Sequence, residues 1–345
     1  MNARKNHHYV SQSYLKAWSN NHHKVWAYRV LVSHQSVPEW TQSSIKSIAN
    51  HQNLFTRSME GQDSDEIEIW MDQQIETPAQ IALLKARSGE QLDQHDLHKL
   101  LRFVALHSIR SPAFYMENMP RWQLEMPTLL NDVLQSTVEK LQQSEGIGSS
   151  QVSDIHGDSL LIPLKVSKEI SEESEWGHLK AELLLGRGIW LFTIRHILSS
   201  TYQVLTEHTW SILEAPKGLE WLTSDNPTIR LNYYDTDSYD FKGGWGNKGS
   251  EVVFPLSPRF LLYTQVGNHE NISGIAPREL YIMLNRFIVE NAHRYIFASN
   301  SVKDVSKIRP RNVNKEIFDQ EKQEWESWHA RQKELEQEYQ KNKEG

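Results

Sequence analysis

Side chains able to carry acid–base chemistry are concentrated near the start of the chain. His7 and His8 are adjacent, and Gln12 follows four residues after His8. A neutral imidazole accepts a proton and a protonated one donates it, so two neighbouring histidines can supply a general base and a general acid. The aromatic residues Tyr14 and Trp18 follow, and these favour burial. The stretch therefore predicts reactive groups held against a core.

A second set of polar side chains lies at the end of an apolar helix. The spacing of apolar residues from Asp93 onward predicts a broad-faced, central helix capped by Asp93. His107 and Arg110 are three residues apart, so they share one side of that helix. A buried arginine needs an acceptor. Two interpretations remain open, namely a hydrogen-bonded core pair and a group that binds phosphate or carboxylate.

Composition excludes several classes of protein. The chain has 345 residues and no cysteine, which excludes disulfide scaffolds, cysteine zinc sites, iron–sulfur clusters and thiol nucleophiles. Its length fits two domains or one large irregular domain. No apolar signal segment and no stretch of roughly 20 apolar residues is present, so we expect a cytoplasmic protein that does not cross a membrane.

The charge is unevenly distributed along the chain. Residues 1–59 contain seven Lys or Arg, among them Lys5, against the single acid Glu39, whereas the whole chain has a net charge of −7. This segment also carries six histidines and several aromatic residues. Such a segment fits a nucleic-acid partner. The alternative is that it packs on the acidic remainder of the protein.

Hydrophobic periodicity predicts an α+β fold. We expect a helical body over residues 65–200, with a kink or restart at Pro78 and a stop at Gly89, and an antiparallel sheet thereafter. Period-two segments predict the strands of this sheet at residues 209–213, 219–223, 228–233, 252–254 and 260–266. Residues 25–30 predict a further strand, which is expected to add to the sheet. Long helices are predicted over 112–143, 176–200 and 276–298, the first of them interrupted at Pro120 and Pro127.

The predicted domain organisation is one α+β domain over residues 1–300, with a sub-boundary at the polar linker near 145–160, and a charged helical tail over 301–345. The helix predicted over 313–342 has few apolar positions. It is expected to be peripheral to the fold, and to offer a surface for a protein partner or a second copy.

One glycine-rich loop superficially suggests nucleotide binding. Residues 243–250 read Gly-Gly-Trp-Gly-Asn-Lys-Gly-Ser, but a phosphate-binding loop requires a different spacing between a strand and a helix. The sequence therefore contains no nucleotide-binding motif.

Four short motifs together resemble the bacterial family called domain of unknown function 4238. They are His-His-Tyr-Val-Ser-Gln at 7–12, Arg-Ser-Pro at 110–112, Thr-Ser-Asp-Asn-Pro at 223–227 and Phe-Pro-Leu-Ser-Pro at 254–258. Ser11 stands where the family pattern has proline, and Ser111 where it has threonine. The resemblance spans roughly residues 6–300. It implies no settled activity, although similar genes are often accessory or associated with antiviral defence.

These residues support the hypothesis of one cleft that cleaves phosphodiester bonds, in RNA more readily than in DNA. The expected catalytic residues are His7, His8, Arg110 and Asp225. The expected substrate-binding residues are Gln12, His107, Asn226 and Lys5. We expect Arg110 to meet the carboxylate of Asp225. A metal-free reaction needs the histidines and the arginine, whereas a divalent metal needs Asp225 with Glu76 or a histidine.

The competing hypothesis is a non-enzymatic module that binds nucleic acid, a nucleotide or a partner protein, with structural histidines. Asp225 and Asn226 then only form a turn before Pro227.

Overall fold

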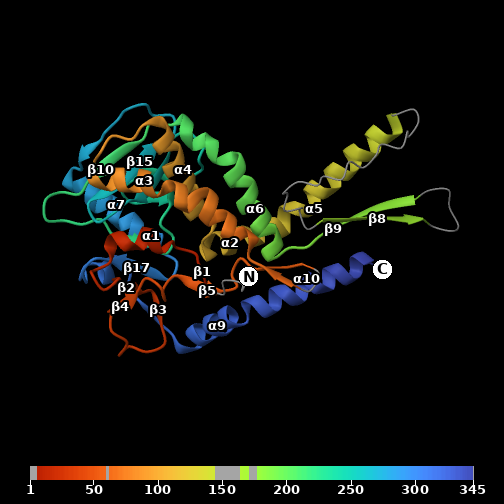
Figure 1. The fold of residues 1–345 in the computed structure, drawn as a ribbon, viewed down its shortest axis with the longest axis horizontal. Coiled ribbons are helices and arrows are strands. Elements are labelled where there is room, and N and C mark those ends of the chain that lie inside the picture. Colours follow the sequence, from red (N-terminus) through yellow and green to blue (C-terminus); the bar gives the residue numbers. More distant parts are fainter. Residues whose placement is uncertain (1–5, 60–61, 144–163, 171–176, 345) are drawn as a thin grey trace.

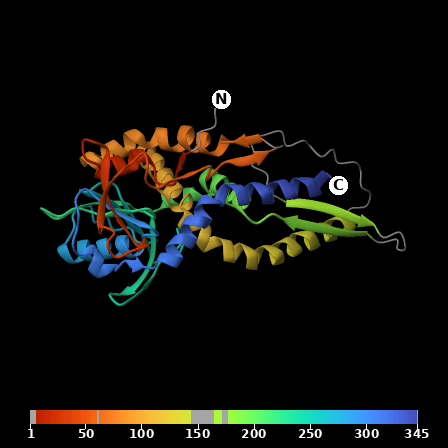
Figure 2. The same cartoon turned by 90° about the horizontal axis from the view of Figure 1, so that it is seen from below.

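The structure is a computed structural model, and it describes residues 6–59, 62–143, 164–170 and 177–344. Helices and two main sheets form a body. Three elements extend from one end of it (Figures 1 and 2), namely α5 (Pro112–Gln143), the hairpin β8–β9 (Leu164–Ile170, Gly177–Leu183) and α10 (Trp328–Glu344). Lys5 and the linker expected near residues 145–160 lie outside the described residues. The predicted mixture of helices and antiparallel strands is confirmed.

The helical body surrounds α4 (Gln94–Ile109). The Asp93 side chain caps this helix by accepting a hydrogen bond of 2.7 Å from the Asp96 amide, as expected. Gly89 ends the preceding helix with a left-handed φ of 75°, a conformation that costs glycine little. The other helices of this body are α2 (Glu66–Met71), the π-helical turn η2 (Asp72–Glu76), α3 (Thr77–Ser88), α6 (Arg187–Ser199) and the short helix η3 (Thr201–Glu207).

Six strands form the larger sheet, in which all pairs are antiparallel except β10–β16. Their spatial order is β13 (Ser238–Asp240), β12 (Ile229–Asp235), β14 (Ser250–Pro255), β15 (Phe260–Gln265), β10 (Ser211–Glu214) and β16 (Gly274–Ile275). The period-two pattern after residue 200 thus predicted four strands of this sheet, namely β10, β12, β14 and β15. The strand predicted over 219–223 is wrong, because only Thr223 of that segment is in a strand, β11 (Thr223–Ser224), which belongs to the other sheet.

A second, four-stranded sheet corrects two predictions. Its order is β11 (Thr223–Ser224), β17 (Tyr295–Ala298), β2 (Lys24–Arg29) and β4 (Trp40–Ser44). The strand near Trp26 exists but joins this sheet and not the larger one. The helix predicted over 276–298 ends early as α7 (Arg278–Glu290), because Tyr295–Ala298 pairs with β2 and β11.

The helix predicted over 176–200 is also wrong in its first half. Gly177–Leu183 is strand β9, which pairs with β8, and only α6 is helical. The interruptions predicted at Pro120 and Pro127 are also wrong, because α5 continues through both prolines. Short two-stranded pairs complete the fold. They are β1 (Asn6–His8) with β5 (Asn50–Gln52), β6 (Arg57–Met59) with β7 (Gln62–Ser64), and β3 (Leu31–Val32) with β18 (Asn312–Val313).

The N-terminal segment is anchored in the core. α1 (Gln12–Leu15) continues into the short helix η1 (Lys16–Trp18). The Tyr14 hydroxyl lies 2.7 Å from the Thr223 hydroxyl and donates to the Pro255 carbonyl at 2.8 Å, and the Trp18 indole donates to the Trp221 carbonyl at 2.8 Å. Both side chains are at most 1% exposed. These contacts fix β1 against the body.

The C-terminal segment is not peripheral, so that prediction is wrong. After the short helix α8 (Val305–Ile308), α9 (Lys315–Glu326) packs on β3, and α10 packs on β6 and extends from the body (Figure 1). Trp328, Gln332 and Glu336 of α10 are each 7% exposed. The tail's charge density misled the prediction because part of that charge is paired in the interior. Among the described residues, no helix is long and apolar enough to cross a membrane.

Candidate active site

Strand β1 places the two N-terminal histidines on opposite faces, since side chains alternate along a strand. His7 is fully buried, its Nδ1 accepts a hydrogen bond of 3.0 Å from the Phe55 amide, and its Nε2 lies 3.5 Å from the Asp65 carboxylate. Its ring is stacked on Phe55. The expectation that both histidines act on one substrate is therefore wrong: His7 supports the strand from behind.

His8 faces an open cleft of about 650 Å³. Its Nδ1 lies 3.5 Å from the side-chain nitrogen (Nε2) of Gln12, the first residue of α1. This distance is at the limit of a hydrogen bond, so the contact is weak. Burial and then the Arg110 guanidinium lower the pKa of His8, although backbone contacts with Lys46 and Ile45 oppose them. His8 is therefore neutral near pH 7, the state in which an imidazole accepts a proton.

The facing wall of the cleft is a row of carboxylates. Glu68, Asp72 and Glu76 line it at intervals of four residues along α2 and η2. The π-helical turn η2 lies where the chain approaches Pro78, which lacks an amide hydrogen, so the predicted kink takes this form. π-helical turns are frequent at functional sites because they re-aim side chains. Here the turn ends at Glu76.

Arg110 lies behind this wall and is fully buried. It donates to the Glu76 carboxylate and to the His8 carbonyl, and it lies 3.6 Å from the Glu68 carboxylate. Burial of Glu76 would raise its pKa, but the Arg110 guanidinium and a hydrogen bond with Ser11 hold the pKa of Glu76 below its ordinary value. The buried arginine thus has the carboxylate partner that its burial requires. That partner is Glu76 and not Asp225 as expected.

Asp225 is engaged elsewhere. It is 1% exposed, and its two carboxylate oxygens accept hydrogen bonds of 2.9 and 2.8 Å from the amides of His293 and Arg294. Burial raises its pKa even though these amides lower it. Asn226 exchanges hydrogen bonds with Asn291 and accepts one from the Ser111 hydroxyl. The turn interpretation of this motif agrees with these contacts, and the expected catalytic and metal roles of Asp225 do not.

The geometry also limits the metal hypothesis. Within the described ranges, no group of three or more His, Asp or Glu side chains is close enough together to hold a metal ion. Asp225 and Glu76 were the expected ligands, but Asp225 uses both oxygens on backbone amides. A metal bound to the cleft would instead meet one or two carboxylates of the wall.

His107 joins the N-terminal segment to α4. It is fully buried, its Nδ1–H donates to the Phe103 carbonyl at 3.0 Å, and its Nε2 accepts from the Ser11 amide at 3.3 Å. Burial, followed by the Arg110 charge, lowers the pKa of His107 to about 3. With both ring nitrogens occupied, His107 is structural, and its expected contact with a substrate is wrong.

This histidine makes stability dependent on pH. The unfolded chain binds a proton near pH 6.5, whereas folded His107 does not until about pH 3, so stability falls as pH drops through this window. Between pH 8 and 5 we expect a loss of about 2 kcal/mol from this group. Urea unfolding of the natural chain and of His107→Gln at both pH values measures it. Equal losses in the two proteins would contradict the assignment.

Four of the aromatic residues in the basic N-terminal segment are buried, whereas Trp26 is half-buried. Tyr9, Tyr14, Trp18 and Tyr28 are at most 3% exposed, so these rings cannot stack on nucleobases. Arg29 pairs with Glu321 of α9 at 3.0 Å. Arg29 therefore packs on the acidic part of the chain, as the alternative interpretation of this segment predicts.

Glu68 and Asp72 were not among the residues expected in the site. A signal for them is present in the sequence, since carboxylates at 68, 72 and 76 repeat every four residues and therefore share one helix face. That pattern is also typical of a solvated face, which is why it does not identify a site by itself. The opposing strand β1 and the buried Arg110 distinguish a cleft wall from a solvated helix face.

Comparison with known proteins adds the family. No solved structure and no curated protein matches the chain. A family described as "Protein of unknown function (DUF4238)" matches residues 6–302. This range contains β1, the carboxylate wall and Arg110, and it ends before α9 and α10. The chain belongs to the DUF4238 family.

Proposed function

We propose that this protein cleaves phosphodiester bonds, in RNA more readily than in DNA, at the cleft of His8. The observation that supports the proposal is the meeting of His8, Gln12 and Glu76 from three separate elements in one open cleft, with a neutral imidazole facing a row of carboxylates. Assembly of polar groups from distant parts of a chain is characteristic of active sites.

His8 is the general base in this proposal. Its Nδ1, beside the Gln12 side chain at the cleft, can take the proton from a ribose 2′-hydroxyl while that oxygen attacks the adjacent phosphorus. The bond from phosphorus to the 5′-oxygen of the next nucleotide breaks, which leaves a 2′,3′-cyclic phosphate, and the 5′-oxygen takes a proton from water in the open cleft. DNA lacks the 2′-hydroxyl and cannot react in this way, which is the reason for the preference for RNA. Gln12 orients the imidazole through the same nitrogen and can move to the substrate. Arg110 does not touch the substrate, because it is fully buried; it holds Glu76 and the backbone of His8 in place.

The carboxylate wall requires a cation for this chemistry. Glu68, Asp72 and Glu76 would repel a bare phosphate, and Lys46 is the one lysine or arginine among the residues that line the cleft. The nearby charge of Arg110 is already used by Glu76 and Glu68. Mg²⁺ is commonly held by one or two carboxylates together with substrate phosphates. This mode fits a cleft without a closed cluster of three ligands. A metal-free reaction by two histidines and an arginine is not supported, since His7 and Arg110 are buried.

His8→Gln is expected to lose at least about two orders of magnitude in the rate of RNA cleavage while the fold is retained, because only the general base is removed. End-labelled RNA and DNA of one sequence are incubated with the protein in Mg²⁺, in Mn²⁺ and in EDTA. His22→Gln is the matched control, since His22 is exposed and belongs to the same basic segment.

Cleavage that depends on the cation and on His8, but not on His22, supports the proposal. Cleavage that survives in His8→Gln shows a contaminating nuclease or another site. Binding without cleavage under all three conditions would replace the proposal with the non-enzymatic binding module.

A further inference from the structure

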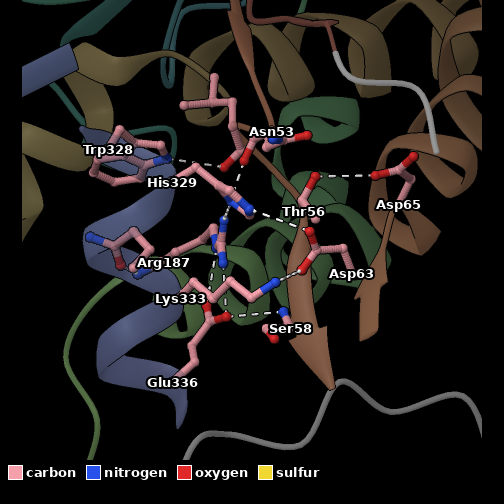
Figure 3. A network of polar contacts seen from close by, with 12 residues as sticks. Asn53, Thr56, Ser58, Asp63, Asp65, Arg187, Trp328, His329, Lys333 and Glu336 are labelled. Carbon is pink, nitrogen blue, oxygen red and sulfur yellow. Dashed lines mark hydrogen bonds and ion pairs between the residues drawn. The ribbon is translucent and has the colours of Figure 1, made fainter. Parts of the chain in front are cut away.

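Arg187, the first residue of α6, is a second fully buried arginine, and its charge is neutralised by the C-terminal helix. Its guanidinium donates to both carboxylate oxygens of Glu336 at 3.0 and 2.7 Å (Figure 3). It also donates to the Asn53 carbonyl at 3.2 Å and contacts Nδ1 of His329 at 2.9 Å. Hydrogen bonds of this kind, between charged groups away from water, hold a fixed geometry.

Further contacts join α10 to the hairpin β6–β7. Glu336 accepts a hydrogen bond of 3.0 Å from the Ser58 amide of β6, and Lys333 donates to the Asp63 carboxylate of β7 at 2.9 Å (Figure 3). His329 lies 3.5 Å from the same carboxylate. The hairpin leads directly into α2, which begins the carboxylate wall. α10 therefore holds the segment from which the wall starts.

The loop between β5 and β6 connects the same network to the back of the cleft. Asn53, whose carbonyl Arg187 binds, has a φ of 55°, a left-handed conformation that is uncommon outside glycine. Two residues later, the Phe55 amide donates to His7 and the Phe55 ring lies 5.6 Å from the Arg110 guanidinium. Asn53 is thus two residues from Phe55, whose side chain contacts both His7 and Arg110. These two residues lie behind His8 and Glu76.

The loop is held by its own backbone and by two side chains from elsewhere. The Thr56 amide donates to the Asn53 carbonyl at 3.3 Å, and Arg187 and the Trp328 indole of α10 donate to the carbonyls of Asn53 and Leu54. The family match ends at residue 302, before α9 and α10 begin. The C-terminal helix is thus an element outside the matched region that reaches the framework of the cleft.

We propose that α10 positions the cleft, with Arg187 and Glu336 as positioning residues that fix the 53–56 loop behind His7 and Arg110 and the hairpin that leads to the carboxylate wall. As a statement about catalysis, this inference rests on the proposed function. As a statement about the geometry of the cleft, it can be measured without any activity.

The test compares Glu336→Gln with Glu336→Asp and with Glu338→Gln in the full chain. Glu338 is exposed on the same helix and serves as the control for charge. Hydrogen–deuterium exchange of peptides over residues 6–12 and 66–80 reports the two walls of the cleft, and residues 250–265 in the large sheet report global opening. The melting temperature and the steady-state rate of RNA cleavage are measured for the same variants.

Glu336→Gln is expected to speed exchange about tenfold in residues 6–12 and 66–80 and to leave residues 250–265 unchanged, because only the local framework loosens. kcat should fall about tenfold or more with little change in KM, since the substrate-contacting groups remain. Glu336→Asp should restore most of the natural exchange rate and of the natural kcat. Glu338→Gln should change neither the exchange rate nor kcat. If Glu336→Gln does not fold, Lys333→Gln removes a more exposed contact of the same network and should give a smaller change in the same peptides.

Two results would overturn the inference. One is unchanged exchange in both cleft peptides, and the other is an equal rise in residues 250–265, which would show a purely global effect. A natural chain without RNA cleavage ends the proposed function, yet the exchange measurement still decides whether α10 positions the cleft.

Discussion

Deleting residues 315–345 is expected to lower the melting temperature by about ten degrees or more, or to prevent folding. The deletion removes Glu336 and the rest of α10, so Arg187 loses its carboxylate together with part of the cover that buries it. Breaking one side of a buried ion pair costs about 3–5 kcal/mol where the remaining charge stays dry, and less where water reaches it. It also uncovers the site of Trp328, which is 7% exposed and packs edge-on against Tyr115 and Trp190.

The loss extends to α9. The Trp325 carbonyl accepts a hydrogen bond of 2.5 Å from His51 of β5, and the Trp325 ring lies 4.1 Å from the Arg294 guanidinium. Thermal unfolding of the full chain, of the deletion and of a Glu334→Gln/Glu338→Gln variant measures the effect. The double variant removes two exposed charges of α10 without these contacts, and it should melt within a few degrees of the natural chain. A soluble deletion that melts at the natural temperature would contradict the docked position of both helices.

The error about this tail has a physical cause. Residues 313–342 are rich in charge, and charged side chains are rarely buried unless they are paired. The charge pattern therefore predicted a solvated helix. The pairing that buries Glu336 comes from Arg187, 149 positions away, and no local pattern contains that information.

Local signals predicted elements well where the element depends on its own residues. The Asp93 cap, the apolar breadth of α4 and the stop at Gly89 are properties of short segments, and the structure confirms them. The hairpin strands β14 and β15 also follow from their own alternation and the short turn between them.

Elements that depend on distant pairing were predicted less well. Tyr295–Ala298 is β-branched and aromatic, as a strand should be, but it directly follows a helical pattern, so the sequence predicts one continuous helix. Its partner β2 lies near the other end of the chain. The apolar spacing of Gly177–Leu183 also suits a helix, so the sequence predicts that this segment is continuous with α6. Strand pairing over long distances decided both cases.

In the site, too, local patterns predict some features and distant contacts decide the others. Burial of Arg110 and its need for a carboxylate follow from its place on an apolar helix. The identity of that carboxylate does not, since Asp225 and Glu76 both lie at element ends. The structure selects Glu76 because η2 packs beside α4, while the backbone at His293 and Arg294 occupies Asp225. The opposite orientations of His7 and His8 follow from strand alternation, which a short N-terminal segment does not reveal until its partner β5 is known.

Glu76→Met is expected to destabilise the protein by about 3–5 kcal/mol, because it leaves the fully buried Arg110 with Glu68 at 3.6 Å as its remaining carboxylate. Arg110→Met is expected to cost less. The side chain of Glu76 is 17% exposed at the cleft, so water can solvate its freed charge. Chemical unfolding of both variants, with circular dichroism as the probe, measures the two losses.

The double variant Arg110→Met/Glu76→Met decides whether the two residues act as a pair. Replacing both charged groups by apolar side chains of similar size leaves no uncompensated charge, so the double variant should lose less than the sum of the single losses, with a coupling of at least about 2 kcal/mol. The same cycle with Arg121 and Glu125 is the control, because that pair is joined at 2.8 Å but lies on the exposed surface of α5. Its coupling should stay under about 1 kcal/mol. Strictly additive losses at Arg110 and Glu76 would show that the ion pair behind the cleft does not hold the His8 backbone and the carboxylate wall together as one unit.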